Sequence, residues 1–256
     1  MKLEGKIAII TGGATGLGKA MALEFANAGA DIVVCSRNKE NIKKMRDEIK
    51  ALGRRSLAIA ADVCINEQVV NMVKQVIDEF GRIDILVNNS GTSRHSPIID
   101  LAEDDWDLVT NTNLKGVFLC TQAVAKHMIE QKYGKIINIA STVALGSIEV
   151  GGSAYASSKF GVVGFTKASA REFGQYGINV NAIAPGRVLT NIVYAHRTPE
   201  QVKQFIEVGK TTAVLGRLGI PEDVAHLALF LASDDASFIN AETIACNGGR
   251  TNLMGR

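Results

Sequence analysis

The chain of 256 residues lacks any apolar run long enough to span a bilayer, and residues 1–6 lack the apolar core of a secretory signal. Its formal net charge of +2 is too small to favour nucleic acid or a membrane surface as a partner. The 4 cysteines and 4 histidines are scattered without CxxC or HxxxH spacing, so no metal site is expected. Scattered thiols are typical of buried small residues in a reducing compartment. We therefore expect a cytoplasmic globular protein.

Short uncharged strands alternate with amphipathic helices along the chain. The strands are expected at residues 6–11, 32–35, 56–60, 83–87, 135–139, 178–183 and 242–246. The helices are expected at residues 19–28, 38–52, 66–80 and 114–131. This alternation predicts an α/β fold, a doubly wound Rossmann-type parallel sheet with helices on both faces. No linker or repeat interrupts it, so residues 1–256 are expected to form a single domain.

Ligands of such sheets bind beyond the carboxyl ends of the strands, and a glycine-rich turn follows the first strand there. Its sequence at 11–18 is TGGATGLG, a GxxxGxG order rather than GxGxxG. Glycines let the backbone turn tightly and approach a pyrophosphate, and the following helix offers free N–H groups to the anion. A dinucleotide is therefore expected against Gly12, Thr15, Gly16, Leu17 and Gly18.

The residues after the second strand bear on which dinucleotide is bound. A carboxylate here would favour NAD, whereas this chain has Ser36 and Arg37, which suit a 2′-phosphate. NADP(H) is the preferred cofactor and NAD(H) the alternative, since Arg37 could be a solvated residue stacking on either adenine. After the third and fourth strands, the residues expected near the adenine and its ribose are Asp62, Val63, Asn89 and Gly91.

A tyrosine and a lysine stand four positions apart, at Tyr155 and Lys159. On a helix they share one face. An ammonium about 4 Å away, at an effective dielectric of about 20, favours the phenolate by up to roughly 4 kcal/mol. That would bring the pKa of Tyr155 from about 10 to near 7, where general acid–base catalysis is efficient. The alternative is a surface tyrosine beside a solvated lysine.

Taken in order, these motifs resemble the short-chain dehydrogenase/reductase family, in its single-domain branch of about 250 residues. The resemblance runs from residue 6 to 249. It includes the glycine-rich turn, Asp62-Val63, Asn88-Asn89-Ser90-Gly91, Asn113, Ser141, Tyr155 with Lys159, Pro185-Gly186 and Asn247-Gly248-Gly249. It implies an NAD(P)(H)-dependent oxidoreductase that interconverts a ketone or aldehyde and an alcohol.

The resemblance also implies roles for individual residues. Tyr155 would exchange a proton with the substrate oxygen, and Lys159 would lower the pKa of Tyr155 and bind the nicotinamide ribose. Ser141 would donate a hydrogen bond to the substrate oxygen, and Asn113 would anchor a proton-relay water. The carboxamide end of the nicotinamide would lie against Pro185, Gly186, Val188 and Thr190.

Four departures from the family pattern stand out. The interval from Ser141 to Tyr155 is one residue longer than expected, so Thr142 remains the alternative catalytic hydroxyl. Ser90 replaces the usual alanine. Near the end of the chain, Asn240-Ala241 stands where the family has Thr-Gly, and Asn247 replaces an aspartate. These last positions concern packing and subunit contact more than chemistry.

Residues 187–213 correspond to the usual substrate lid, with a helix expected to start at Thr198-Pro199. Loops at the active end carry polar and cationic residues, and the expected substrate contacts are Arg94, His95, Arg187 and Tyr194, with Glu149 and His196 nearby. They favour a polar or anionic substrate such as a sugar or polyol, a hydroxy acid or a 3-oxoacyl compound. The alternative is that several of them point into water.

The family tends to form tetramers, so a homotetramer is expected. Gly161, Gly164 and Ala168 give one helix a small-residue face that suits close packing, on the subunit itself or on a partner. Two other functions remain open, an epimerase or dehydratase of the same family and a non-catalytic dinucleotide-binding protein.

Overall fold

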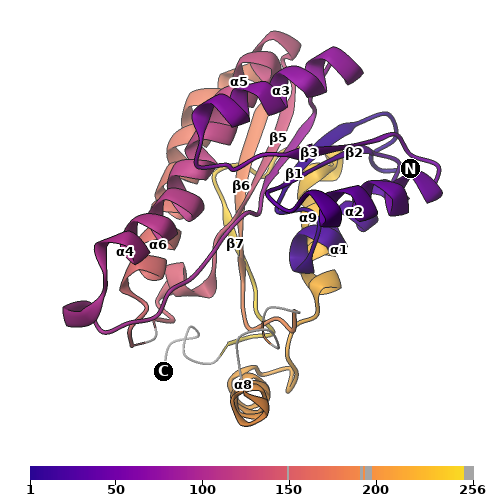
Figure 1. Cartoon of the computed structure of the whole chain (residues 1–256). Coiled ribbons are helices and arrows are strands. Elements are labelled where there is room, and N and C mark those ends of the chain that lie inside the picture. Colours follow the sequence, from indigo (N-terminus) through magenta and orange to yellow (C-terminus); the bar gives the residue numbers. More distant parts are fainter. Residues whose placement is uncertain (149, 191–192, 194–197, 251–256) are drawn as a thin grey trace.

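A single parallel sheet of seven strands, in the order β3-β2-β1-β4-β5-β6-β7, organises the computed structural model (Figure 1). The structure describes residues 1–148, 150–190, 193 and 198–250. The strands are β1 (Ile7–Thr11), β2 (Asp31–Ser36), β3 (Ser56–Ala60), β4 (Ile85–Asn88), β5 (Gly134–Ile139), β6 (Ile178–Pro185) and β7 (Thr243–Cys246). The predicted doubly wound α/β fold is confirmed, because the strand order reverses between β1 and β4.

Helices cover both faces of the sheet (Figure 1). One face is covered by α1 (Gly16–Asn27), α2 (Lys39–Ala51) and α9 (Pro221–Ala232), and the other by α3 (Asn66–Phe80), α5 (Gly116–Gln131) and α6 (Ser153–Phe173). Beyond the carboxyl ends of the strands lie α4 (Glu103–Thr110) and α8 (Pro199–Thr212). As predicted, Thr198 caps α8, but α1 begins at Gly16 rather than near residue 19. Among the described residues, no helix is long and apolar enough to cross a membrane.

The strands are apolar on both sides because each side faces a separate core. Along β1, Ile10 packs with the helices α1, α2 and α9, while its neighbour Ile9 packs with α3 and α5. Along β2, Val34 packs in the same core as Ile10, and Val33 packs in the same core as Ile9. Side chains alternate across a strand with a period of two, so a continuous apolar run is what a strand buried on both faces requires.

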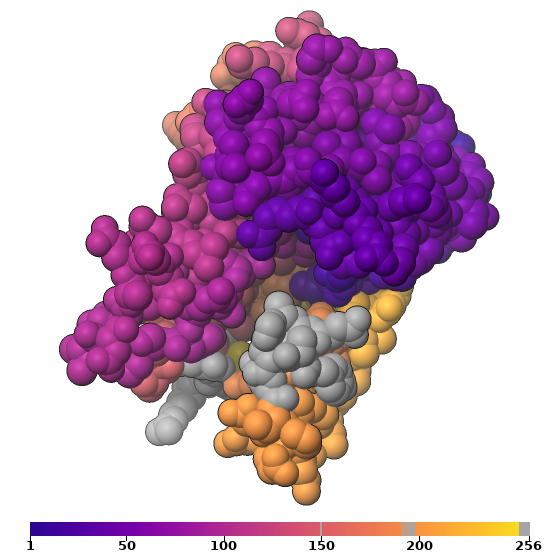
Figure 2. Space-filling model, viewed as in Figure 1, coloured from indigo at the N-terminus to yellow at the C-terminus, as the bar shows by residue number. Residues whose placement is uncertain are grey.

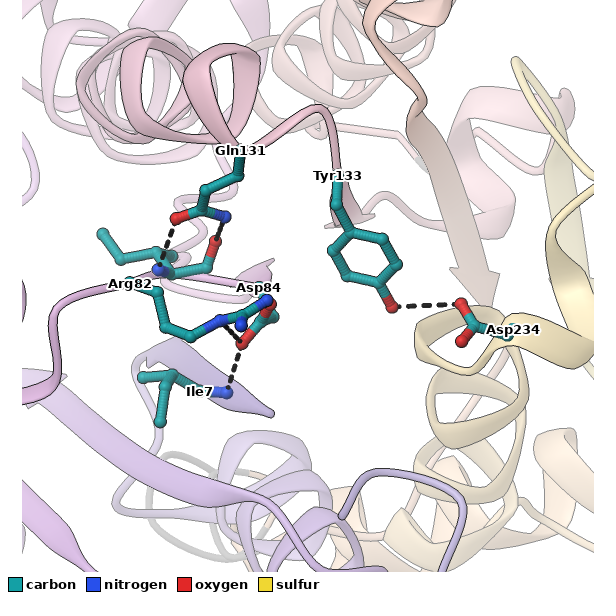
Figure 3. A network of polar contacts seen from close by, with 7 residues as sticks. Ile7, Arg82, Asp84, Gln131, Tyr133 and Asp234 are labelled. Carbon is teal, nitrogen blue, oxygen red and sulfur yellow. Dashed lines mark hydrogen bonds and ion pairs between the residues drawn. The ribbon is translucent and has the colours of Figure 1, made fainter. Parts of the chain in front are cut away.

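The amino ends of β1 and β4 are held by a buried carboxylate, far from the glycine-rich turn (Figure 3). Asp84, which is fully buried, accepts hydrogen bonds from the backbone N–H of Ile7 at 2.9 Å and from Nε of Arg82 at 3.0 Å. Gln131 pairs with both backbone groups of Ile83, at 2.8 and 3.1 Å. These bonds replace the water that the strand ends would otherwise bind, and they fix the register of β1 beside β4.

Asn240-Ala241, one of the departures from the family pattern, forms a turn that enters β7. Ala241 adopts a φ of 63°, a left-handed conformation that favours glycine. Its backbone N–H donates to Oδ1 of Asn240 at 3.1 Å, and the same oxygen accepts from the N–H of Val180 at 2.8 Å. These bonds to the asparagine side chain hold the strained turn against β6.

Candidate active site

The ends of β1 and β4 are joined by side chains at the point where the strand order reverses. Oγ1 of Thr11 accepts from the N–H groups of Asn89 and Ser90, at 3.0 and 3.1 Å. The amide of Asn89 donates to the carbonyls of Thr11 and Gly12, at 3.0 and 3.1 Å. Asn89, expected near the ribose, thus uses both amide hydrogens to support the glycine-rich turn. Figure 2 shows the surface hollowed below these strand ends, between the magenta segment that includes α4 and the orange α8.

The glycine-rich turn has no room for larger side chains. A Cβ on Gly13 would lie 2.8 Å from the carbonyl oxygen of Ile10, and one on Gly12 would lie 2.9 Å from Nδ2 of Asn89. Gly16 opens α1 with a φ of 53°. The first turn of α1 has no acidic residue, and the side chain of its N-cap, Thr15, does not bond to the helix. The turn therefore fits a pyrophosphate, because the helix presents backbone N–H groups and a positive dipole end to it.

The residues expected to contact the adenosine end lie together at the carboxyl ends of β2 and β3. Nη1 of Arg37 is 3.8 Å from Oδ2 of Asp62, and its side chain is 71% exposed. Asp62 is held in place, since its Oδ1 accepts from the N–H of Cys64 at 2.9 Å. Ser36 ends β2, and Val63 is buried. A cation and a carboxylate thus stand side by side where an adenosine would lie.

Tyr155 and Lys159 lie on α6, one turn apart, as predicted. Lys159 is only 5% exposed, so the alternative of a solvated lysine is wrong. Its Nζ donates to the carbonyl of Ile139, at the end of β5, at 2.7 Å, and lies 5.7 Å from the centre of the Tyr155 ring. Burial lowers the pKa of the Lys159 ammonium to about 8, because the charged form loses its hydration.

Asn113 lies on a widened, π-helical turn (Asn111–Lys115) between α4 and α5. It is fully buried, and its Oδ1 accepts from the N–H of Thr92 at 2.8 Å. Its Nδ2 donates to the carbonyl of Thr92 at 2.9 Å and to Oγ of Ser158 at 3.0 Å. The side chain therefore ties the loop after β4 to α6. A Cβ on Gly91 would lie 3.3 Å from Oδ1 of Asn113 and 3.8 Å from Nζ of Lys159.

The two candidate hydroxyls after β5 differ in their contacts. Ser141 precedes a short 3₁₀ helix (Thr142–Leu145), and its Oγ accepts from the N–H of Val143 at 3.2 Å. Thr142 is 2% exposed, and its Oγ1 accepts from Nη1 of Arg250 at 3.4 Å. Thr142 is thus turned toward the end of the chain, and Ser141 stands two residues beyond Ile139, the carbonyl partner of Lys159.

The segment expected to hold the nicotinamide follows β6. The N–H of Gly186, the residue after Pro185, donates to the carbonyl of Cys246 at 2.9 Å, and Val188 pairs with Gly219 in a parallel bridge. The Thr190 side chain would lie 3.7 Å from a Cβ on Gly16. Thr190 therefore adjoins the glycine-rich turn, and the two expected ends of a dinucleotide site lie on one continuous edge.

The expected substrate residues are dispersed. Nε of Arg94 donates to Asp105, on α4, at 3.2 Å, so this guanidinium is turned toward α4. His95 is exposed. The guanidinium carbon of Arg187 lies 4.8 Å from the centre of the Phe205 ring, on α8. Tyr194, Glu149 and His196 lie outside the described residues. Among the residues that the structure describes, no group of three or more His, Cys, Asp or Glu side chains is placed to bind a metal ion.

Several polar contacts of this region were not predicted from the sequence, although Asn88 and Thr11 belong to motifs that the sequence shows. Nδ2 of Asn88 donates to Oδ1 of Asn138 at 2.8 Å, and Nδ2 of Asn138 donates to Oγ1 of Thr166 at 2.9 Å, so the strands β4 and β5 are linked to α6. An asparagine inside an apolar strand is the signal that could have identified Asn138. Thr11 and Arg250 carry no such signal, because their partners are distant in the sequence.

The comparisons with known proteins agree with this geometry. A family model described as short chain dehydrogenase matches residues 6–201. The chain is 46% identical over 255 residues to the (2S)-[(R)-hydroxy(phenyl)methyl]succinyl-CoA dehydrogenase subunit BbsD of Thauera aromatica, with 100% of both chains covered. It is 41% identical over 249 residues to the 3-oxoacyl-[acyl-carrier-protein] reductase FabG of Thermotoga maritima, covering 97% of this chain and 99% of that protein.

A solved short-chain type dehydrogenase/reductase from Mycobacterium marinum has the same fold, with a TM-score of 0.90 and 36% identity over 98% of this chain and 97% of that one. The protein described here belongs to the short-chain dehydrogenase/reductase family. It is therefore an oxidoreductase acting on an alcohol or ketone, and the family implies a nicotinamide dinucleotide as its cofactor.

Because Lys159 is buried, the stability of the protein is expected to depend on pH, and Lys159→Met should remove this dependence. Below about pH 8 the amine is charged in both states, and its burial costs a constant free energy. Between about pH 8 and 10.5 the folded protein has lost the proton and the unfolded chain retains it, so the wild type gains stability. From pH 7.5 to 10, urea unfolding without cofactor should show the wild type gaining about 2 kcal/mol relative to Lys159→Met.

Lys167→Met is the matched control, since Lys167 is an exposed lysine on the same helix. The stability of this variant should follow that of the wild type over the whole pH range. If the difference between wild type and Lys159→Met stayed constant with pH, the amine would not be desolvated in the folded protein.

Proposed function

We propose that this protein catalyses the NADP(H)-dependent interconversion of a 3-oxoacyl and a 3-hydroxyacyl compound, with Tyr155 as general acid and base. The observation that carries the proposal is the burial of Lys159, whose amine is held at the end of β5 one helical turn from Tyr155. An ammonium in this place favours the phenolate of Tyr155, which lets the phenol give and take a proton near neutral pH.

The edge formed by the strand ends would hold the cofactor. The glycine-rich turn would bind the pyrophosphate, Arg37 with Ser36 the 2′-phosphate, and Asp62 with Val63 the adenine. The remaining contacts are Asn89, Gly91, Tyr155, Lys159, Pro185, Gly186, Val188 and Thr190. When bound, the nicotinamide supplies or accepts the hydride. The fit of these residues to a dinucleotide is supported by the tight packing of Gly12 and Gly13 and by the uncapped amino end of α1.

In the direction of reduction, the Tyr155 hydroxyl donates its proton to the substrate oxygen as the carbonyl carbon gains a hydride. Lys159 stabilises the phenolate that remains, and Ser141 donates a hydrogen bond to the same substrate oxygen. Asn113 acts as a positioning residue, since both of its amide hydrogens are bound to Thr92 and Ser158. A relay water at Asn113 would therefore donate a hydrogen bond to an oxygen of this residue, because its amide hydrogens are already used.

The names of two relatives support the substrate class. One describes a hydroxyl-bearing carbon attached to carbon 2 of a succinyl group, and the other a 3-oxoacyl group. In both, the oxygenated carbon is β to a carboxyl carbon. The position where carrier-linked reductases place a docking arginine is occupied by Tyr176 here, which favours a substrate that is not delivered by a carrier protein. Residues 187–213, which include α8, would cover this substrate.

Catalysis by Tyr155 predicts that Tyr155→Phe loses about 10²- to 10⁴-fold in kcat for NADPH-dependent reduction of a 3-oxoacyl thioester. Ser141→Ala should lose about 10²- to 10³-fold, because the hydroxyl acts where charge develops. Thr142→Val should lose much less, which distinguishes the two hydroxyls. NADPH binding, followed by fluorescence, confirms that each variant is folded. Wild-type turnover by Tyr155→Phe would refute the mechanism.

The choice of cofactor is tested at Arg37. Arg37→Gln should lower kcat/KM for NADPH about 10- to 100-fold, since a charge-assisted hydrogen bond contributes about 1.5–3 kcal/mol. The value for NADH should change about twofold or less, because NADH has no 2′-phosphate. Arg46→Gln, on α2, is the matched control. Equal losses with both cofactors would mean that Arg37 stacks on the adenine instead.

The small-residue face of α6 supports a homotetramer. Gly161 packs within the subunit, because a Cβ there would lie 2.6 Å from Leu114. Gly164 and Ala168 are exposed instead, with Phe160 beside them on the helix at 46% exposed. An apolar face of this kind is suited to a second subunit. Sedimentation equilibrium at micromolar concentration should give four times the chain mass, and a monomer there would exclude the tetramer.

A further inference from the structure

Ser158 lies on α6 directly before Lys159, and it is fully buried. Its hydroxyl makes two hydrogen bonds that lead in different directions. It donates to the carbonyl of Tyr155, about one helical turn earlier, at 2.8 Å, and it accepts from Nδ2 of Asn113 at 3.0 Å. The hydroxyl therefore connects the helix that carries Tyr155 and Lys159 to the π-helical turn that carries Asn113.

The direction of both hydrogen bonds is fixed by the chemistry of the partners. A backbone carbonyl can only accept, so the single hydroxyl hydrogen of Ser158 is used on Tyr155. The hydroxyl oxygen is left to face Asn113, and it binds an N–H of the Asn113 amide. On the other side, the backbone N–H of Thr92 requires an acceptor, which Oδ1 of Asn113 supplies at 2.8 Å. The amide of Asn113 is therefore held in one orientation from both sides.

This orientation places the amide oxygen of Asn113 near the buried amine of Lys159. A Cβ on Gly91 would lie 3.3 Å from Oδ1 of Asn113 and 3.8 Å from Nζ of Lys159, so the two atoms border the same small space. An oxygen in this place favours the charged form of the amine, whereas the N–H groups of a flipped amide would oppose it. The orientation of the Asn113 amide therefore bears on the charge of Lys159.

A serine at position 158 is unfavourable for the helix unless its hydroxyl is used. Alanine has a higher helix propensity than serine, and burying a hydroxyl costs free energy when the group lacks hydrogen-bond partners. At Ser158 the bonds to Tyr155 and Asn113 offset this cost. The preceding residue, Ser157, is exposed to solvent on the same helix. The two adjacent serines thus allow a buried and a solvated hydroxyl to be compared directly.

We infer that Ser158 is a positioning residue for the reaction, because its hydroxyl holds the amide of Asn113 with the oxygen toward Lys159. Ser158 acts through Asn113, since its own side chain is buried between α6 and the π-helical turn. The inference rests on the proposed function for the roles of Tyr155 and Lys159. It adds to that function a buried hydroxyl on which the arrangement of the acid–base pair depends.

Kinetics on variants of Ser158 test the inference. Ser158→Ala should lower kcat for a 3-oxoacyl thioester about 3- to 10-fold, the effect of one neutral hydrogen bond, and change KM for NADPH about twofold or less. Ser158→Thr keeps the hydroxyl and should recover most of the loss. In an Asn113→Ala background, Ser158→Ala should cost about twofold or less, because the amide that it positions is already absent. Ser157→Ala is the matched control and should behave as the wild type.

A measurement without substrate separates this inference from the proposed function. The backbone N–H of Thr92 is bound to Asn113 in a loop whose neighbouring residues, Gly91 and Ser93, are exposed, so its hydrogen exchange reports on the Asn113 amide. Ser158→Ala should speed this exchange about 3- to 10-fold in the protein without cofactor, as the loss of one hydrogen bond allows. If no thioester is reduced and the exchange still depends on Ser158, the proposed reaction fails and the positioning of Asn113 stands.

Three results would overturn the inference. They are unchanged exchange at Thr92 in Ser158→Ala, unchanged kcat of this variant in an enzyme that reduces the thioester, and equal losses from Ser158→Ala with and without Asn113. Thermal melting identifies any variant that fails to fold. Ser158→Cys fills a similar volume with a thiol that forms only weak hydrogen bonds, so it takes the place of Ser158→Ala if the alanine variant is unfolded.

Discussion

The candidate active site depends on one hydrogen bond, from the buried ammonium of Lys159 to the carbonyl of Ile139 at 2.7 Å. Taking an ammonium out of water is costly, so the amine stays buried only where the surrounding structure supplies acceptors in fixed positions. The carbonyl at the end of a parallel strand is such an acceptor, because the strand has no further partner for it. The position of β5 therefore sets the position of Lys159 and, one turn away, of Tyr155.

The surrounding polar contacts keep this arrangement rigid. The widened turn at Asn111–Lys115 points the Asn113 amide inward, where it joins Thr92 to Ser158. Extra π turns often mark functional sites, since they redirect a side chain without ending the helix. Thr11 closes the neighbouring strand ends in a similar way. The polar groups around the site thus form hydrogen bonds with one another, which keeps the walls of the site in place while the site itself stays open to ligands.

Predictions based on periodicity and local spacing were accurate, and those that required a side-chain direction were less so. The seven strands were placed within two residues of their observed bounds, and α3 was predicted over its observed range. Arg94 stays a predicted substrate contact, and its Nε donates to Asp105, a partner that no local pattern indicated. The start of α1 was placed too late, because Gly16 already adopts the conformation that opens the helix.

The sequence by itself determined the order of strands and helices, the glycine-rich turn and the pairing of Tyr155 with Lys159, since each of these depends on neighbours within a few residues. Only the tertiary structure decided that Lys159 is buried, that Thr142 faces Arg250 and that Ser158 binds the amide of Asn113. Those relations join residues far apart in the chain. They arise from the closing of the sheet and the packing of its ends, which no local pattern of residues encodes.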